Sequence, residues 1–336
     1  MIQGHGDDIY RYKDIRVNFS SNVYSHFCHE GLFCYLADKL DNVVSYPEPV
    51  PTRLENALAQ LLGLQPTEVC VTNGATEAIY LIAQTFRRSH SAILVPTFSE
   101  YQDACQIHEH QISFIHNFQL SSFNSQLVWL CNPNNPTGSV MDKKVLAQAI
   151  EKNPKTLFVV DASYAPFTEE TLLNVQEGCH YPNVLMLHSM TKEYAIPGLR
   201  LGYITGNKNL LEEVRRQRMP WSVNQMAIDA GFYMLSHPDE FQLPLHDLML
   251  ERQRVAQRLT ALGCVDVWPS QTHILLCKLR IGKAAALKDY LATEHGLLIR
   301  DASNFQGLDD GFFRIAVQDK TENDTLIRAI EEWICL

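Results

Sequence analysis

The chain has 336 residues, of which 46% are hydrophobic and 20% charged. This apolar content is enough to bury a large core, so the composition excludes an intrinsically disordered chain and suits one large α/β unit with a smaller second one. The formal net charge is −10 and no cluster of Lys and Arg is present. Nucleic acids and anionic membranes are therefore poor candidates for the main partner.

Targeting signals and cysteine chemistry are the next features to consider. No apolar run approaches the roughly 18 residues that a membrane span needs. The first residues have neither the basic nor the apolar region of a secretory signal, so we expect a cytoplasmic protein. Nine cysteines are scattered without a C-x-x-C pair, which favours reduced thiols over disulfides or a zinc ribbon. No carboxylate–histidine set has convincing metal spacing, and we expect no metal.

We expect residues 1–45 to be an irregular arm that contains one helix at 32–40. We also expect this arm to pack with the small domain. Three prolines then break regular structure between Tyr46 and Pro51. After them we predict a helix at 53–62, with Thr52 as its N-cap and Glu55 completing a capping box.

From residue 69 onwards, short apolar runs alternate with helical patterns, which is typical of a mostly parallel, doubly wound sheet covered on both faces. The predicted strands are 69–72, 92–95, 111–115, 127–131, 157–160 and 184–187. The predicted helices between them are 75–87, 99–108 and 143–151.

After Asn224 the pattern changes to that of an α+β unit. We predict helices at 225–235, 244–262, 284–295 and 323–333, with strands at 273–279 and 313–317. The expected domains are therefore the arm (1–45, part of the small domain), a large domain (46–235) and a small C-terminal domain (236–336).

Three polar motifs follow apolar strands, at the positions where open α/β sheets bind ligands. Small residues after the first strand, Gly74, Ala75 and Thr76, allow backbone N–H groups to hold an anion at a helix N-terminus, although an ordinary turn has the same composition. Asp161 and Tyr164 could hold a ring nitrogen and a ring hydroxyl, or could be a helix cap and a packing residue.

The third motif contains Lys192, which follows an apolar strand. A buried lysine is costly, and a Schiff base, which needs the neutral amine, gives it a reason to be there. Ser189 and Arg200 would bracket a phosphate; the alternative is a solvated loop. Each motif is weak alone, but their order and spacing constrain one another, because Lys192 follows Asp161 by 31 residues and Arg200 follows Lys192 by 8.

Together the motifs resemble the fold type I enzymes that use pyridoxal 5′-phosphate (PLP), more narrowly the histidinol-phosphate aminotransferase branch, and within it the threonine-phosphate decarboxylases of cobalamin biosynthesis. The resemblance implies an α/β fold of the PLP-dependent transferase (aspartate aminotransferase) type, with a doubly wound, mostly parallel sheet in a large domain and a smaller α+β domain. It is carried by residues 5–6, 19–22, 132–138, 194–203, 219–224 and 298–300.

The same resemblance implies residue roles. Lys192 would bind PLP covalently and move protons, Asp161 would pair with the pyridine nitrogen, and Phe98 would stack on the ring. Asn135 and Tyr164 would contact the ring oxygen. The cofactor phosphate would be held by Gly74, Ala75, Thr76, Ser189, Thr191 and Arg200, together with Tyr46 from the partner subunit of a homodimer. Substrate would be bound by His5, Gly6, Asn22, Asn135, Arg300 and Arg314, with Arg314 on the α-carboxylate and Arg300 on a phosphate.

The sequence leaves the reaction open. A decarboxylase would convert O-phospho-L-threonine to aminopropanol phosphate, whereas an aminotransferase would act on histidinol phosphate. A PLP-binding regulator without turnover is a third class, although no DNA-binding domain fits before Asn22. His5 and Gly6 are followed by Asp7 and Asp8, where the decarboxylases have Gly and Asn; the aminotransferase sequence Asp-Glu-Ala-Tyr appears as Asp161-Ala-Ser-Tyr164.

Overall fold

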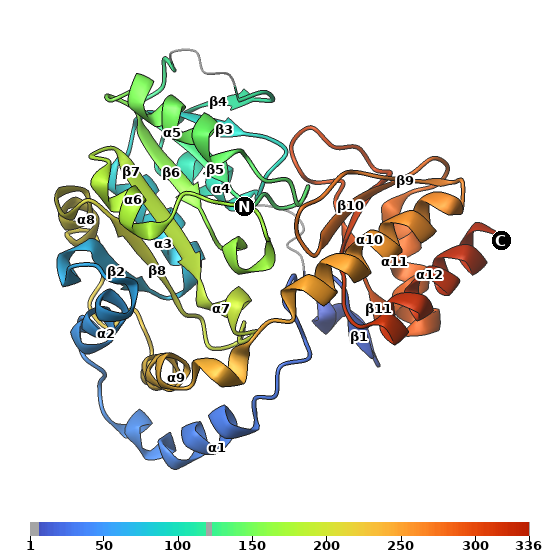
Figure 1. Cartoon of the computed structure of the whole chain (residues 1–336), viewed down its shortest axis with the longest axis horizontal. Helices are drawn as coiled ribbons and strands as arrows, with labels where there is room; N and C mark the ends of the chain where they lie inside the picture. Colours follow the sequence, from blue (N-terminus) through green and yellow to red (C-terminus); the bar gives the residue numbers. More distant parts are fainter. Residues whose placement is uncertain (1–6, 119–122, 336) are drawn as a thin grey trace.

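A seven-stranded sheet forms the centre of the N-terminal two thirds of the molecule (Figure 1). The computed structural model describes residues 7–118 and 123–335. The strand order is β2-β8-β7-β6-β5-β3-β4, in which β8 runs antiparallel to both neighbours and the other pairs are parallel. The strands are β2 (Val69–Thr72), β3 (His90–Leu94), β4 (Gln111–Ile115), β5 (Leu127–Cys131), β6 (Leu157–Asp161), β7 (Val184–Ser189) and β8 (Gly202–Gly206).

Helices cover both faces of this sheet, which is why its central strands are continuous apolar runs. Every residue of β5 and β6 is buried. The helices of this part are α2 (Thr52–Leu62), α3 (Gly74–Thr85), α4 (Glu100–Ile107), α5 (Lys143–Lys152), α6 (Val175–His180), α7 (Met190–Glu193), α8 (Lys208–Arg215) and α9 (Gln225–Ser236).

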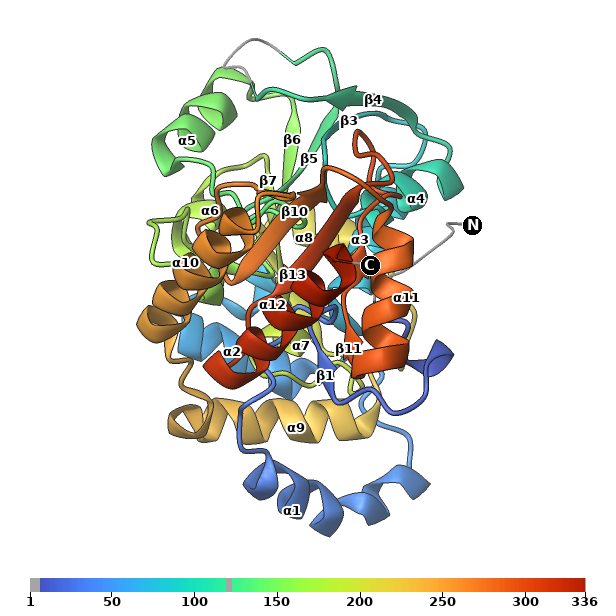
Figure 2. The same cartoon turned by 90° about the vertical axis from the view of Figure 1, so that its right-hand side faces the viewer.

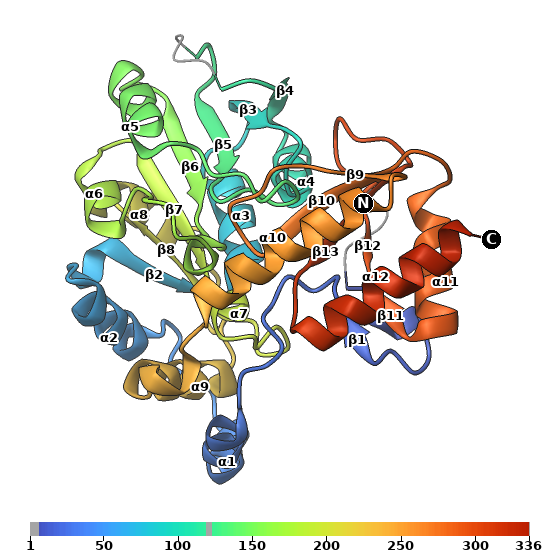
Figure 3. The ribbon, with the colours of Figure 1, turned by 45° about the vertical axis from the view of Figure 1, so that its right-hand side comes forward.

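The C-terminal third forms a four-stranded antiparallel sheet, in the order β12-β13-β10-β9, with helices on its outer side (Figure 2). Its longest helix, α10, extends from the large sheet towards this small one (Figure 3). The elements are α10 (Leu245–Ala261), β9 (Val265–Val267), β10 (Ile274–Leu279), α11 (Ala284–His295), β12 (Arg300–Asp301), β13 (Phe312–Ala316) and α12 (Lys320–Ile334). Short 3-10 turns are η1 (Ile9–Arg11), η2 (Leu40–Val44), η3 (Pro66–Glu68), η4 (Ala165–Phe167) and η5 (Pro238–Phe241).

The N-terminal arm contacts both parts of the molecule. Its strand β1 (Val17–Asn18) pairs in parallel with β11 (Leu297–Leu298) next to the small sheet. Its helix α1 (Glu30–Asp38) instead packs against α9, and Leu32 and Leu36 are buried in the same apolar cluster as Leu54. The segment between β1 and α1 thus leads from the small sheet to the large one, past the edge where the strands end.

The expected α/β architecture, with its mostly parallel doubly wound sheet, is confirmed; the domain boundaries stay a prediction. β8 was not predicted, because it is bounded by Gly202 and Gly206, and α8 was not predicted either. No described helix has the length and apolar character that crossing a membrane requires.

The predicted capping box at Thr52 is wrong. Thr52 is the first residue of α2, and Pro51 holds the cap position. Glu55 is buried and accepts hydrogen bonds from the backbone N–H of Val71 at 3.0 Å and from Arg218 Nη1 at 2.7 Å. A buried carboxylate gains more from a buried guanidinium than from an exposed cap, because its desolvation has to be offset.

Candidate active site

A pocket of about 980 Å³, including its part open to solvent, lies where the carboxyl ends of the large sheet meet the small sheet. This is the edge at which open α/β sheets bind ligands. Thirteen of the residues singled out in the sequence line it: Asn22, Ala75, Thr76, Phe98, Asn135, Asp161, Tyr164, Ser189, Thr191, Lys192, Arg200, Arg300 and Arg314. They come from segments spread over almost the whole chain, so the fold, rather than local sequence, assembles the site.

Asp161 ends β6 at the floor of the pocket and is 4% exposed. Its Oδ1 accepts a hydrogen bond from the Ser163 backbone N–H at 2.9 Å, and its Oδ2 accepts one from the Tyr101 hydroxyl at 2.6 Å. Burial raises the pKa of Asp161, while these hydrogen bonds and the Lys192 ammonium oppose that rise.

Lys192 lies on α7, directly after β7, and its Nζ donates a hydrogen bond to the Ser21 carbonyl oxygen at 2.7 Å. Burial, together with the positive charges of Arg314 and Arg200, lowers the pKa of Lys192 to about 8. The neutral, nucleophilic fraction of this amine near neutral pH is therefore a minority, but it is far larger than that of an ordinary lysine.

Two arginines enter the pocket from the small sheet. Arg300 and Arg314 are directly opposite each other on β12 and β13, and they are 6% and 3% exposed. Arg314 donates to Asn135 Oδ1 at 2.6 Å and to the Ser20 carbonyl oxygen at 2.5 Å, while its Nε has no partner. Burial, and to a smaller extent Arg300, lowers the pKa of Arg314, which stays charged at neutral pH.

The Arg300 side chain contacts two residues that follow β12. Its Nη2 donates to Asn304 Oδ1 at 2.8 Å, and its guanidinium lies over the Phe305 ring, 5.4 Å from the centroid. Two cations side by side in one pocket repel each other unless anions join them. The pair therefore favours a ligand that carries two negative groups, or one doubly charged group.

Asn22 and Tyr164 face each other across the pocket wall. The Asn22 side-chain amide donates to the Tyr164 hydroxyl at 2.9 Å, and Asn22 Oδ1 is buried without a partner. Burial raises the pKa of Tyr164, so its hydroxyl keeps its proton. A buried oxygen without a partner is costly, and a ligand that donates a hydrogen bond there would remove the cost.

The other side of the pocket has the composition of an anion site. Ser189 and Thr191 are in hydrogen-bond contact through their hydroxyls at 2.7 Å, close to the N-terminal residues of α3. Gly74, the first residue of α3, does not line the pocket itself. A Cβ at this position would come within 2.6 Å of Arg200 Nη2. The small residue lets the Arg200 guanidinium reach the α3 N-terminus, where a phosphate gains both from the helix dipole and from the cation.

The two acidic residues near the N-terminus have different environments. Asp7 lines the pocket, accepts a hydrogen bond from Asn18 Nδ2 at 2.5 Å, and donates from its backbone N–H to Ser20 Oγ at 3.2 Å. Asp8 is buried and bound to Lys288 Nζ at 2.6 Å. One of the two carboxylates thus belongs to the pocket, and the other is neutralised outside it.

Among the predicted site residues that the structure describes, Tyr46 and Gly74 do not line this pocket. Tyr46 is 85% exposed, lies apart from the pocket, and has its ring 5.3 Å from that of Trp221. His5 and Gly6 fall outside the described residues. The sequence analysis missed Tyr101, which resembles an ordinary packing residue of a helix, and Phe305, and it gave no site role to Ser20 and Ser21 of the 19–22 motif; all four line the pocket.

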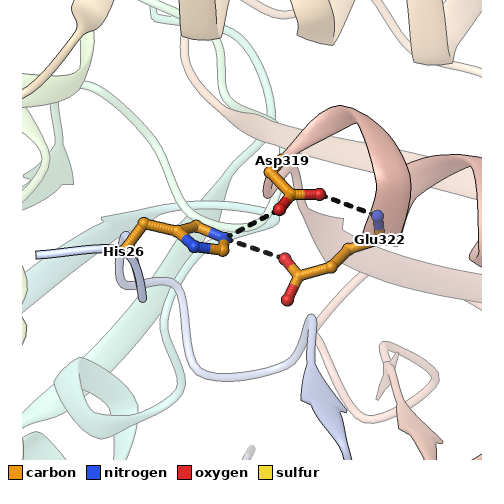
Figure 4. A group of neighbouring side chains, drawn as sticks. All are labelled: His26, Asp319 and Glu322. Atoms are coloured by element: carbon orange, nitrogen blue, oxygen red, sulfur yellow. Dashed lines mark hydrogen bonds and ion pairs between the residues drawn. The ribbon is translucent and has the colours of Figure 1, made fainter.

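One group of described side chains away from the pocket has the composition of a metal site (Figure 4). His26, Asp319 and Glu322 place one potential ligand atom each within 4.8 Å of one another. His26 Nε2 is 2.8 Å from Glu322 Oε2, and Asp319 caps α12 through the Glu322 N–H. These contacts fasten the segment before α1 to the start of α12.

The relatives of this chain agree with the geometry of the site. The model of the aminotransferase class I and II family matches residues 14–330, and the chain belongs to this family. It is therefore an enzyme of a PLP-dependent family, as the motifs indicated. A threonine-phosphate decarboxylase of Salmonella typhimurium is 30% identical over 333 residues, which cover 94% of this chain and 91% of the relative.

Two further comparisons extend this result. A histidinol-phosphate aminotransferase of Thermoanaerobacter sp. is 30% identical over 312 residues, covering 88% of this chain and 86% of the relative. Among solved structures, L-threonine-O-3-phosphate decarboxylase from Porphyromonas gingivalis superposes with a TM-score of 0.93 at 38% identity, over 95% of this chain and 100% of the other. The predicted resemblance to this branch is confirmed.

Proposed function

We propose that this chain is a PLP-dependent decarboxylase of a phosphorylated amino acid, which converts O-phospho-L-threonine to aminopropanol phosphate and carbon dioxide in cobalamin biosynthesis. The observation that carries the proposal is the pair of buried arginines, Arg300 and Arg314, in the same pocket as Lys192. O-Phospho-L-threonine has a carboxylate and a phosphate, one for each guanidinium. The similarity to the two decarboxylases supports the same substrate class.

The residues around Lys192 fit PLP. A buried amine with a lowered pKa, a buried carboxylate 4% exposed, an aromatic ring at Phe98 and a cation-and-hydroxyl cluster at Arg200 correspond to the aldehyde, the ring nitrogen, the ring face and the phosphate of the cofactor. The unpartnered Oδ1 of Asn22 and Nε of Arg314 are polar atoms that a cofactor–substrate complex would satisfy.

When bound, PLP supplies an electron sink for the pair of electrons released as a bond to the substrate Cα breaks. Arg314 binds and orients the carboxylate, and Arg300 binds the phosphate, so that the Cα–carboxylate bond is the one held in the reactive direction. Lys192 would take up a proton from the substrate's ammonium group, hold it as an ammonium near Cα, and donate it to Cα once carbon dioxide has left. Asn135 keeps Arg314 in place through its 2.6 Å hydrogen bond.

The other assignments belong to the same proposal. Gly74, Ala75, Thr76, Ser189 and Thr191 hold the cofactor phosphate with Arg200, Tyr164 and Asn135 contact the ring oxygen, and Asn22, His5 and Gly6 complete the substrate site. The enzyme is a cytoplasmic homodimer in which the exposed Tyr46 reaches the partner's phosphate site. The arm (1–45), the large domain (46–235) and the small domain (236–336) are its domains.

An aminotransferase of the histidinol-phosphate type is the second candidate, because such an enzyme is as similar in sequence as the decarboxylase. Histidinol phosphate has no α-carboxylate, and both arginines would then bind its phosphate. The Asp7 carboxylate in the pocket favours this alternative, because its negative charge reduces the net positive charge available to bind two anions.

Product analysis separates the two reactions. Purified, PLP-loaded enzyme is given O-phospho-L-threonine alone, and separately histidinol phosphate with 2-oxoglutarate; carbon dioxide, aminopropanol phosphate and glutamate are measured, with Lys192→Ala as the inactive control. Carbon dioxide and aminopropanol phosphate without a keto acid are the expected products. Glutamate without carbon dioxide would establish the aminotransferase instead.

A further inference from the structure

Tyr101 is a buried residue of α4 for which the mechanism above gives no role. It is 1% exposed, and its hydroxyl donates to Asp161 Oδ2 at 2.6 Å. Its ring stacks on Trp129, with 5.8 Å between the centroids and 22° between the planes. The same ring also forms a T-shaped pair with Phe98, with 5.9 Å between the centroids and 85° between the planes. One side chain thus contacts two proposed cofactor ligands, Asp161 by a hydrogen bond and Phe98 by ring packing.

The Asp161 carboxylate has to be ionised in order to pair with a protonated ring nitrogen, and its burial works against this. The titratable groups that face it are Tyr101 from α4, Cys131 from β5, Tyr164 after β6, and Lys192 from α7. Burial raises the pKa of the Tyr101 hydroxyl well above its usual value, so this group is a fixed proton donor. A short hydrogen bond from a neutral donor stabilises the carboxylate over the carboxylic acid.

The orientation of Tyr101 is fixed from behind. Trp129 is fully buried on β5, and its indole N–H donates to Ser91 Oγ at 3.2 Å, which in turn is 2.8 Å from His110 Nδ1. The Tyr101 ring is therefore held between an anchored indole and the pocket. Such rigid support from a neighbouring layer fixes a functional side chain more accurately than the backbone alone.

We propose that Tyr101 is a positioning residue, whose hydroxyl keeps Asp161 ionised and aimed at the cofactor's ring nitrogen and whose ring braces Phe98. The inference rests on the proposed function, because it assumes the cofactor roles of Asp161 and Phe98. It adds a residue that determines how strongly the ring nitrogen is held in its protonated form.

The test replaces only the hydroxyl, with Tyr101→Phe. The matched control is Tyr80→Phe: the Tyr80 hydroxyl also donates to a carboxylate, Glu100 Oε2 at 2.8 Å, but Tyr80 is not among the described residues that line the pocket. The readouts are the dissociation constant of PLP from the cofactor-free enzyme, and the pH midpoint of the Asp161 carboxyl band in infrared spectra, assigned with Asp161→Asn.

We expect Tyr101→Phe to weaken PLP binding about 10- to 100-fold, as for loss of a hydrogen bond to a charged group. The infrared midpoint of Asp161 should move to higher pH by about one unit or more. Tyr80→Phe should change neither quantity by more than about twofold or a few tenths of a unit.

Three outcomes distinguish the possible failures. If Tyr101→Phe lowers only the thermal stability and matches Tyr80→Phe in both readouts, Tyr101 is purely structural and the inference is overturned. If Asp161→Asn also leaves PLP binding unchanged, the proposed site itself is wrong. If Tyr101→Phe does not fold, the wild-type spectrum decides: a carboxyl of Asp161 protonated at pH 7 overturns the inference, and an ionised one supports it.

Discussion

The Lys288 ammonium lies 2.6 Å and 2.7 Å from the two carboxylate oxygens of Asp8, in an ion pair whose side chains are 10% and 8% exposed. This pair attaches the residues before β1 to α11, and it leaves the neighbouring Asp7 in the pocket. The two consecutive acidic residues therefore have separable effects, one on stability and one on substrate binding.

Breaking the ion pair should cost stability. We expect Asp8→Asn to lower the free energy of unfolding of the cofactor-free enzyme by about 3–5 kcal/mol, because it leaves the buried Lys288 charge uncompensated. Urea unfolding measures this, and Asp14→Asn, at an exposed position, is the control with an expected change within about 0.5 kcal/mol. A change of similar size in both variants would contradict a buried, coupled pair.

The pocket carboxylate should act on substrate affinity. We expect Asp7→Asn to lower KM for O-phospho-L-threonine by about tenfold or less, because one negative charge is removed near the anion-binding Arg314. Steady-state kinetics in low salt measure the effect, and Asp8→Asn serves as the comparison. An increase in KM would show that Asp7 binds the substrate directly.

The lowered pKa of Lys192 predicts its reactivity. Below about pH 8 the amine is mostly protonated and reacts slowly, and above it the neutral form predominates, whereas ordinary lysines reach this point near pH 10.4. Reductive methylation of the cofactor-free enzyme at graded pH, followed by peptide mass spectrometry, should therefore label Lys192 with a midpoint near pH 8. The exposed Lys283 provides the internal control. Equal labelling midpoints for Lys192 and Lys283 would contradict the lowered pKa of Lys192.

Replacing Arg314 by lysine, the chemically most similar residue, should impair substrate binding. Arg314→Lys keeps the charge but loses the planar fork that can bind a carboxylate with two hydrogen bonds, so KM for the substrate should rise about 10- to 100-fold. Arg280→Lys, at an exposed ion pair with Asp266, should leave the kinetics unchanged. An unchanged KM in Arg314→Lys would contradict the proposal that Arg314 binds the substrate carboxylate.

Substitution of Gly74 tests the proposed phosphate site at Arg200 and the N-terminus of α3. Gly74→Ala places a Cβ 2.6 Å from Arg200 Nη2 at a backbone φ of +76°, so both strain and crowding oppose it. Gly263→Ala has a similar φ of +74° but nothing within 4 Å, which isolates the backbone cost of about 1–2 kcal/mol. Both variants should lose stability, but only Gly74→Ala should also bind PLP more weakly, as measured by absorbance titration; equal binding would disprove the contact.

Most of the large sheet could be predicted from sequence because its inner strands, such as β5 and β6, are buried on both faces. The runs at 111–115 and 127–131 coincide with β4 and β5, and the helix at 284–295 coincides with α11. Burial on both faces leaves a continuous apolar run with sharp ends. The sequence pattern did not predict β8, because Gly202 and Gly206 at its two ends are typical of turns.

Most of the pocket was predictable where the residue types are unusual for their position. A lysine after a buried strand or an aspartate at the end of another is conspicuous, so Lys192 and Asp161 stood out. Tyr101 did not, because an aromatic residue in an amphipathic helix is ordinary; only the fold shows that its hydroxyl meets a carboxylate 60 residues away. The Glu55 error has the same cause, since its partner Arg218 is 163 residues distant.

The pairing of β1 with β11 has a consequence for the order in which this protein becomes functional during synthesis. All seven strands of the large sheet lie between residues 69 and 206, so that sheet can form while the rest of the chain is still being translated. Arg314, however, lies in β13, and the first residues can dock only after β11 has been made. The cofactor side of the pocket can therefore form before its substrate side, to which Arg314 of β13 belongs.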